Sequence, residues 1–134
     1  MKRNITKLFF VAMIGVMFAS CATPVSRLET AVKAAQKELP VDTGAGMILT
    51  NMYLENNQMI TVFECDEDIL DIELLQMGFD ASHDEVVANI KNTTDSDSKM
   101  VIELVKEANY DYVMKYVGST SGNEAVIVVT PEEL

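Results

Sequence analysis

The first feature in the pattern of hydrophobic and polar positions is an unbroken apolar run near the N-terminus. Residues Leu8 to Phe18 carry no charge and follow a short basic segment that contains Lys2, Arg3 and Lys7. A run of 11 residues has the length of a signal-peptide core and is too short to span a bilayer. The pattern therefore predicts an N-terminal export signal.

After this run, apolar residues recur with the period of a helix. The spacings are four, three and four residues, and the positions are Leu28, Val32, Ala35 and Leu39. Ser26 and Glu29 have the spacing of a capping box at the start of this helix. Pro40 disfavours helical angles in the residue before it. We expect a helix from about 27 to 38.

Two pairs of β-prone segments then predict two hairpins, made of residues 47–54 with 59–65 and of residues 111–118 with 124–130. In the first pair, the adjacent Asn56 and Asn57 tolerate the positive φ angles of a tight turn. The glycine-containing segment 41–46 before it is expected to be a loop. The third and fourth β-prone segments are apolar on both faces, so either helices cover part of the second face or that face meets a partner.

Between the two hairpins the period is helical again. Asp66 or Asp68 is expected to cap a helix that runs to Met77, with Gly78 as its C-terminal stop. Its expected buried face consists of Leu70, Leu74 and Met77.

Two further helices are expected before the second hairpin. Ser82 and Glu85 have the spacing of a second capping box, with Val86, Val87 and Ile90 buried behind it. Asp95 or Ser96 is expected to cap the next helix, whose apolar face includes Leu104. The predicted fold is α+β: a four-stranded antiparallel sheet from two hairpins, packed with three to four helices in the order α-ββ-αα(α)-ββ.

Charge narrows the classes of function. Without the first 20 residues, seven basic residues remain against 21 acidic ones, which gives a net charge of −14. A nucleic-acid binder needs a surplus of Lys and Arg, so we expect no nucleic-acid partner. The same charge disfavours adhesion of the protein surface to anionic lipid.

The densest cluster of candidate ligands is acidic and extends from Glu64 to Asp71. Asp66, Asp68 and Asp71 are candidate calcium ligands, since hard cations take six to eight oxygen ligands. The run lacks the glycine and the spaced glutamate of an EF-hand, as does the segment 95–97. Helix capping and solubility are therefore the preferred interpretation, and a calcium-binding or hydrolytic site is the alternative. We expect no cofactor and no resident metal.

The remaining candidate side chains are few. The sole histidine, His83, is expected to be exposed at a helix start, and a zinc site with Asp84 and Cys65 lacks supporting spacing. Cys65 is expected to be a small buried hydrophobe at a strand end. No Ser, His or Cys arrangement suited to nucleophilic catalysis is found, so we expect a protein that is not an enzyme.

Residues Phe18-Ala19-Ser20-Cys21 resemble the lipobox of bacterial lipoprotein precursors. The resemblance implies removal of residues 1–20 and lipid on Cys21. It also implies a lipidated tether over 21–26 and a single α+β domain over 27–134. Because Ala22 rather than Asp follows the cysteine, it implies an outer-membrane anchor, which we expect to face the periplasm.

The mature part is similar overall to the small, uncharacterised α+β lipoproteins of Gram-negative envelopes. We therefore expect a lipid-anchored, non-enzymatic binding or interaction module that is attached to the membrane through the lipid on Cys21. A protein partner on the second face of the sheet is the further expectation. An inhibitor-like or chaperone-like periplasmic module is an alternative that rests on size and fold class.

Overall fold

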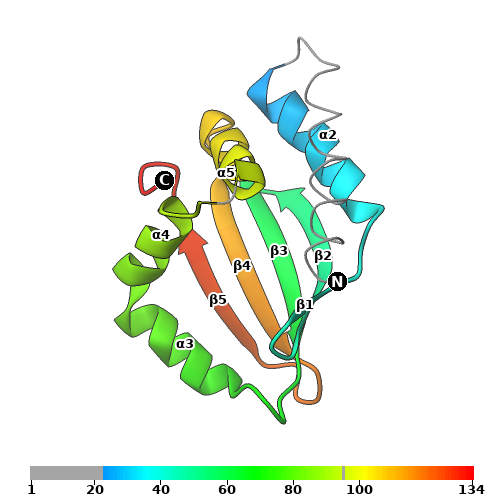
Figure 1. The fold of residues 1–134 in the computed structure, drawn as a ribbon, viewed down its shortest axis with the longest axis vertical. Coiled ribbons are helices and arrows are strands. Elements are labelled where there is room, and N and C mark those ends of the chain that lie inside the picture. Colours follow the sequence, from blue (N-terminus) through cyan, green and yellow to red (C-terminus); the bar gives the residue numbers. More distant parts are fainter. Residues whose placement is uncertain (1–22, 95) are drawn as a thin grey trace.

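A computed structural model describes residues 23–94 and 96–134 of the chain. In this part the elements follow the order α-βββ-ααα-ββ around one sheet (Figure 1). The predicted α+β class is confirmed. The expected four-stranded antiparallel sheet is wrong, because the sheet has five strands and contains one parallel pair. The predicted signal, Cys21 and the predicted Asp95 cap lie outside the described residues.

The first described helix, α2, spans Pro24–Gln36 and begins earlier than expected. Thr23 caps it, because the Thr23 hydroxyl accepts a hydrogen bond from the Ser26 amide at 3.2 Å. The capping box predicted at Ser26 is therefore wrong, and Pro24 occupies a position that suits the fixed φ angle of proline. The buried face consists of Leu28, Ala31, Val32 and Ala35.

The segment expected to be a loop contains strand β1, Val41–Gly44, which pairs antiparallel with β2, Met47–Glu55. The next strand, β3, spans Gln58–Cys65 and completes the first predicted hairpin. Its turn residues Asn56 and Asn57 have φ angles of 51° and 60°. The predicted hairpin and its turn are confirmed.

The second hairpin is also confirmed, with β4 at Asp111–Gly118 and β5 at Glu124–Val129. The two hairpins join through β3 and β4, which run parallel in the strand order β1-β2-β3-β4-β5. A parallel pair requires a long crossover connection, and the three helices between β3 and β4 provide it.

These crossover helices are α3 at Ile72–Ala81, α4 at His83–Lys91 and α5 at Ser96–Glu107. The predicted cap at Asp66 or Asp68 is wrong. Asp71 caps α3, since its Oδ1 accepts hydrogen bonds from the amides of Glu73 and Leu74 at 2.9 and 3.1 Å. Ser82 stands at the N-cap of α4, but its side chain makes no capping hydrogen bond, so the second capping box is also wrong.

The phase of α3 differs from the prediction. Its buried residue is Ile72, with Leu75 and Phe79 partly buried against the core, while Leu74 and Met77 are 63% and 64% exposed. Gly78 lies inside the helix and does not end it.

The described helices pack in two pairs. α2 packs with α5 over the β2 side of the sheet, and α3 packs with α4 on the β5 side (Figure 1). Side chains alternate between the two faces along each strand. The strand residues of the main core, such as Met59, Tyr112 and Ile127, lie on the face that the helices cover. The opposite face carries Ile48 and Val128, each 38% exposed, together with Ile60 and Val113, which are 5% and 4% exposed. Among the described residues, no helix is both long and apolar enough to cross a membrane.

Candidate functional site

A groove of about 430 Å³ with mainly apolar walls lies between the two helix pairs. Its floor is the helix-facing side of the sheet, with Leu49 and Met52 from β2 and Phe63 from β3. The register of β2 shifts between Leu49 and Asn51. This irregularity places Leu49 and Met52, three residues apart, on the same face and widens the apolar floor.

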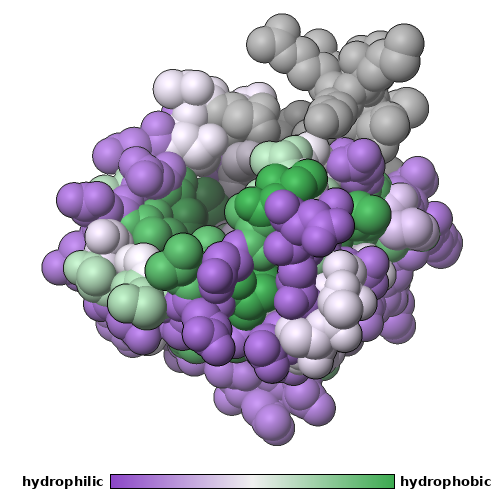
Figure 2. Space-filling model, turned by 90° about the horizontal axis from the view of Figure 1, so that it is seen from below, coloured by the Kyte–Doolittle hydropathy of each residue, from purple (hydrophilic) through white to green (hydrophobic). Residues whose placement is uncertain are grey.

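The walls of the groove come from helices far apart in the sequence. Val86 and Ile90 of α4 line one side, and Val101 and Ile102 of α5 line the other. Val101 is 9% exposed, whereas Val86, Ile90 and Ile102 are half-buried at the margins of the groove. Figure 2, which looks from the lower end of the view in Figure 1, shows a hollow with hydrophobic walls under a hydrophilic rim.

The side chains that line the groove are mostly apolar. Among the described residues that line it, there is no Asp, Glu, His, Lys, Arg or Cys. The hydroxyl of Thr61 donates to the carbonyl of Val113 at 3.1 Å and is therefore already satisfied. Burial raises the pKa of Tyr112, so this phenol stays neutral. An apolar concave surface with a small number of polar groups is suited to binding a ligand or a partner segment.

The acidic candidates lie away from this groove and have local structural roles. Asp66 accepts a hydrogen bond from the Asp68 amide at 2.9 Å in the turn before α3, and Asp71 caps that helix. Within the described residues, no group of three His, Cys, Asp or Glu side chains is arranged to hold a metal ion. The calcium alternative stays a prediction that the geometry does not favour.

Glu67, next to these residues, fixes the turn between β4 and β5. Its Oε1 accepts hydrogen bonds from the amides of Thr120 and Ser121 at 3.0 and 2.7 Å and from the Ser121 hydroxyl at 2.9 Å. These donors, the Ser121 amide first, lower the pKa of Glu67. A Cβ on Gly118 would collide with this carboxylate, so a larger residue there would displace Glu67 from these hydrogen bonds.

The lowered pKa of Glu67 predicts a pH dependence of stability. The unfolded chain binds a proton more readily at this residue, so its contribution is complete above the ordinary pKa of 4.5 and is lost as the pH falls below it. We expect Glu67→Gln to lower the melting temperature at pH 7 and to show a shallower loss on acidification than the wild type. Thermal unfolding from pH 7 to pH 3 measures this difference. Parallel pH profiles for the two proteins would contradict it.

Cys65 is fully buried at the end of β3, as predicted. Burial, followed by the negative charges of Glu64 and Glu67, raises the pKa of its thiol. A thiol held protonated in a closed core is a poor nucleophile, which agrees with the interpretation of Cys65 as a packing residue.

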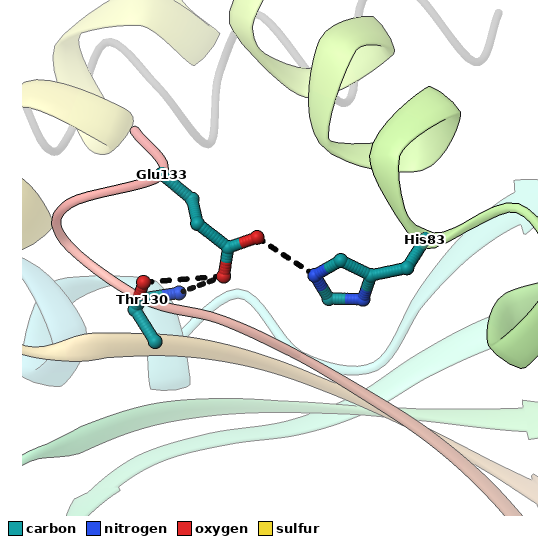
Figure 3. A network of polar contacts seen from close by, with 3 residues as sticks. All are labelled: His83, Thr130 and Glu133. Atoms are coloured by element: carbon teal, nitrogen blue, oxygen red, sulfur yellow. Dashed lines mark hydrogen bonds and ion pairs between the residues drawn. The ribbon is translucent and has the colours of Figure 1, made fainter.

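His83 does not stand free at the start of α4. Its Nε2 lies 2.8 Å from Oε2 of Glu133, whose Oε1 accepts hydrogen bonds from the amide and hydroxyl of Thr130 (Figure 3). The Thr130 amide and then His83 lower the pKa of Glu133. His83 therefore fastens the segment after β5 to α4.

The groove was not foreseen from the sequence, although several of its residues were assigned to apolar helix faces. The helical period predicts that Val86 and Ile90 turn away from water, but it does not say whether the opposite wall touches them. To predict the groove, one would need the distance between α4 and α5. No spacing of residues along the chain encodes this distance.

Neither a family model nor a curated protein sequence matches this chain. The fold, however, is similar to those of several solved bacterial proteins. A Pseudomonas aeruginosa protein described as secreted superposes with a TM-score of 0.57 at 9% identity, covering 85% of this chain and 98% of its own.

Two of the similar structures are pilotins. The pilotin EpsS of the Vibrio vulnificus type 2 secretion system has a TM-score of 0.56 at 11% identity and covers 82% of this chain and 90% of its own. The type II secretion system pilotin AspS of Vibrio cholerae has a TM-score of 0.52 at 12% identity and covers 80% and 88%. At these identities the similarity shows a common fold.

Proposed function

We propose that this chain is a lipid-anchored, pilotin-like accessory protein of the bacterial envelope that binds a segment of a protein partner in its apolar groove. The partner would be a component of an envelope secretion or assembly system. In this proposal the protein has no enzymatic activity, and Cys21 holds it at the outer membrane on the periplasmic side.

The groove carries the proposal. Its half-buried wall residues Val86, Ile90 and Ile102 leave apolar surface that a partner could cover, and burial of such surface from water favours association by about 25 cal/mol per Å². A concave apolar channel between helices is suited to the apolar side of an amphipathic helix. The fold shared with two pilotins and the lipobox-like residues before Cys21 support the class of partner and the compartment.

Site-specific photo-cross-linking in cells tests the site. A photoreactive phenylalanine analogue at Ile102 is expected to give a discrete adduct with one protein, and the same analogue at Val128, on the opposite face of the sheet, is expected to give none. Ile90→Glu places a charge on the facing wall, and the cost of removing water from this charge opposes burial by the partner. We expect it to reduce the yield of the adduct at position 102 at least about tenfold.

The position of the adduct decides between the two surfaces. A strong adduct from position 128, with none from 102, would contradict the groove as the partner site. It would instead support the face of the sheet opposite the helices. No adduct from either position, with both variants present at wild-type levels in the membrane fraction, would contradict the proposed function.

A further inference from the structure

Helix α3 has two apolar faces, and only one of them is buried. Ile72 faces the core, whereas Leu74 and Met77 are 63% and 64% exposed. These two residues are three positions apart and therefore lie together on the outer side of the helix. Ile69, in the turn that leads into α3, is 64% exposed. We call these three residues the α3 patch.

Carboxylates surround the α3 patch. Between Lys37 and Lys91 the chain contains twelve Asp and Glu residues and neither Lys nor Arg. Four of these carboxylates lie close to the patch in sequence and are exposed: Asp68, Asp71, Glu73 and Asp80. The ion pairs found among the described residues involve Glu107, Glu124 and Glu133, so none of them neutralises these four.

A polar hollow of about 500 Å³ adjoins the patch at the lower end of the molecule in Figure 1. Asp42, Glu64, Asp66 and Asp68 line it, together with the turn between β1 and β2. Ile69 of the patch lies against Gly46, which lines the hollow. A Cβ on Gly46 would be only 3.2 Å from Ile69 Cδ1. The exposed Ile69 thus lies beside an anionic recess.

We propose that the α3 patch and this recess dock a basic amphipathic segment of a second protein. The apolar side of the segment would cover Leu74 and Met77, and its Lys or Arg side chains would face the surrounding carboxylates and enter the recess. A second copy of this chain does not fit, because it would bring the same uncompensated negative charge against itself. An anionic bilayer is repelled for the same reason.

The surface is separate from the groove, since no residue of the patch or the recess lines the groove. The inference goes beyond the proposed function and stands even if the groove binds nothing. It depends on the apolar side chains as much as on the charge, and a test must separate these two contributions.

The test uses the mature chain with Cys21→Ala, which retains every described residue and needs no detergent. The probe is a fluorescein-labelled 18-residue helix of leucine and lysine, and the matched probe is the same helix with glutamate in place of lysine. Fluorescence anisotropy is expected to show binding of the lysine peptide that weakens with added NaCl, and no binding of the glutamate peptide.

Two variants locate the contact. Leu74→Gln with Met77→Gln keeps the net charge and replaces exposed side chains, so it is expected to fold normally and to weaken binding of the lysine peptide by about tenfold or more. Ile102→Gln, the matched neutral change in the groove, is expected to leave this affinity unchanged within about twofold.

Three outcomes would overturn the inference. In the first, the wild type does not bind the lysine peptide. In the second, the double glutamine variant, with an unchanged melting temperature, binds as tightly as the wild type, which would leave only general attraction to an acidic protein. In the third, Ile102→Gln abolishes binding, which would place the contact in the groove.

Discussion

Cys21→Ala is expected to abolish incorporation of radiolabelled palmitate and to move the protein from the membrane fraction to the soluble fraction. The lipobox-like residues imply that the Cys21 thiol is the attachment point, and alanine offers no atom for it. Each buried acyl methylene contributes about 0.8 kcal/mol to anchoring, so removal of whole acyl chains leaves no comparable hold on the bilayer. Labelling followed by membrane fractionation measures both effects.

Cys65→Ala is the matched control, since the chain contains two cysteines and the second is fully buried at the end of β3. This variant should incorporate palmitate at the wild-type level. Label that persists in Cys21→Ala, or a wild type that takes up none, would contradict the lipoprotein assignment.

Leu28→Ala is expected to destabilise the folded domain by about 2–5 kcal/mol. Leu28 is fully buried where α2 packs on the sheet and on α5, and its truncation leaves a cavity in the main core. Urea unfolding of the mature chain, followed by circular dichroism, measures the change in the free energy of unfolding.

Glu29→Ala is the control for this prediction, because Glu29 is exposed on the same helix and helix propensity favours alanine. Its effect should stay within about 0.5 kcal/mol. A change equally small for Leu28→Ala would mean that α2 is part of a loose tether and not of the core.

The elements of the fold were largely predictable, because their signals are local. The asparagine turn at 56–57 and the apolar periods of the helices each depend on a few neighbouring residues. Strand β1 was missed because Val41–Gly44 is short and contains a glycine, so its identity as a strand comes from pairing with β2. The parallel pairing of β3 with β4 was missed for a related reason: the path of a long connection is set by packing.

The phase of α3 shows a different limit of sequence patterns. Ile72 and Leu75 lie three residues apart, as do Leu74 and Met77, so either pair satisfies a helical period. The cap at Asp71 and the fit of Ile72 against Cys65 decide which pair is buried. The same ambiguity leaves apolar side chains exposed on α3, where we place the docking of a basic segment.

The candidate groove was predictable only in its parts. Its wall residues follow helical periods, yet the space between α4 and α5 results from how each helix packs against the sheet and against its own neighbour. Hydrophobic periodicity predicts which side of a helix turns away from water. It does not predict whether protein or a partner covers that side.

The cap at Thr23 determines how the domain would stand on a bilayer. Only Ala22 separates Cys21 from the capping residue, and two extended residues span at most about 7 Å. If Cys21 carries lipid, the end with the start of α2 and the β2–β3 turn rests against the headgroups, and the acidic end lies farthest from them (Figure 1). The groove residues Met52, Met59 and Tyr112 lie close to the β2–β3 turn in the strand register, so the groove would be nearer to the headgroups than the acidic residues at the opposite end.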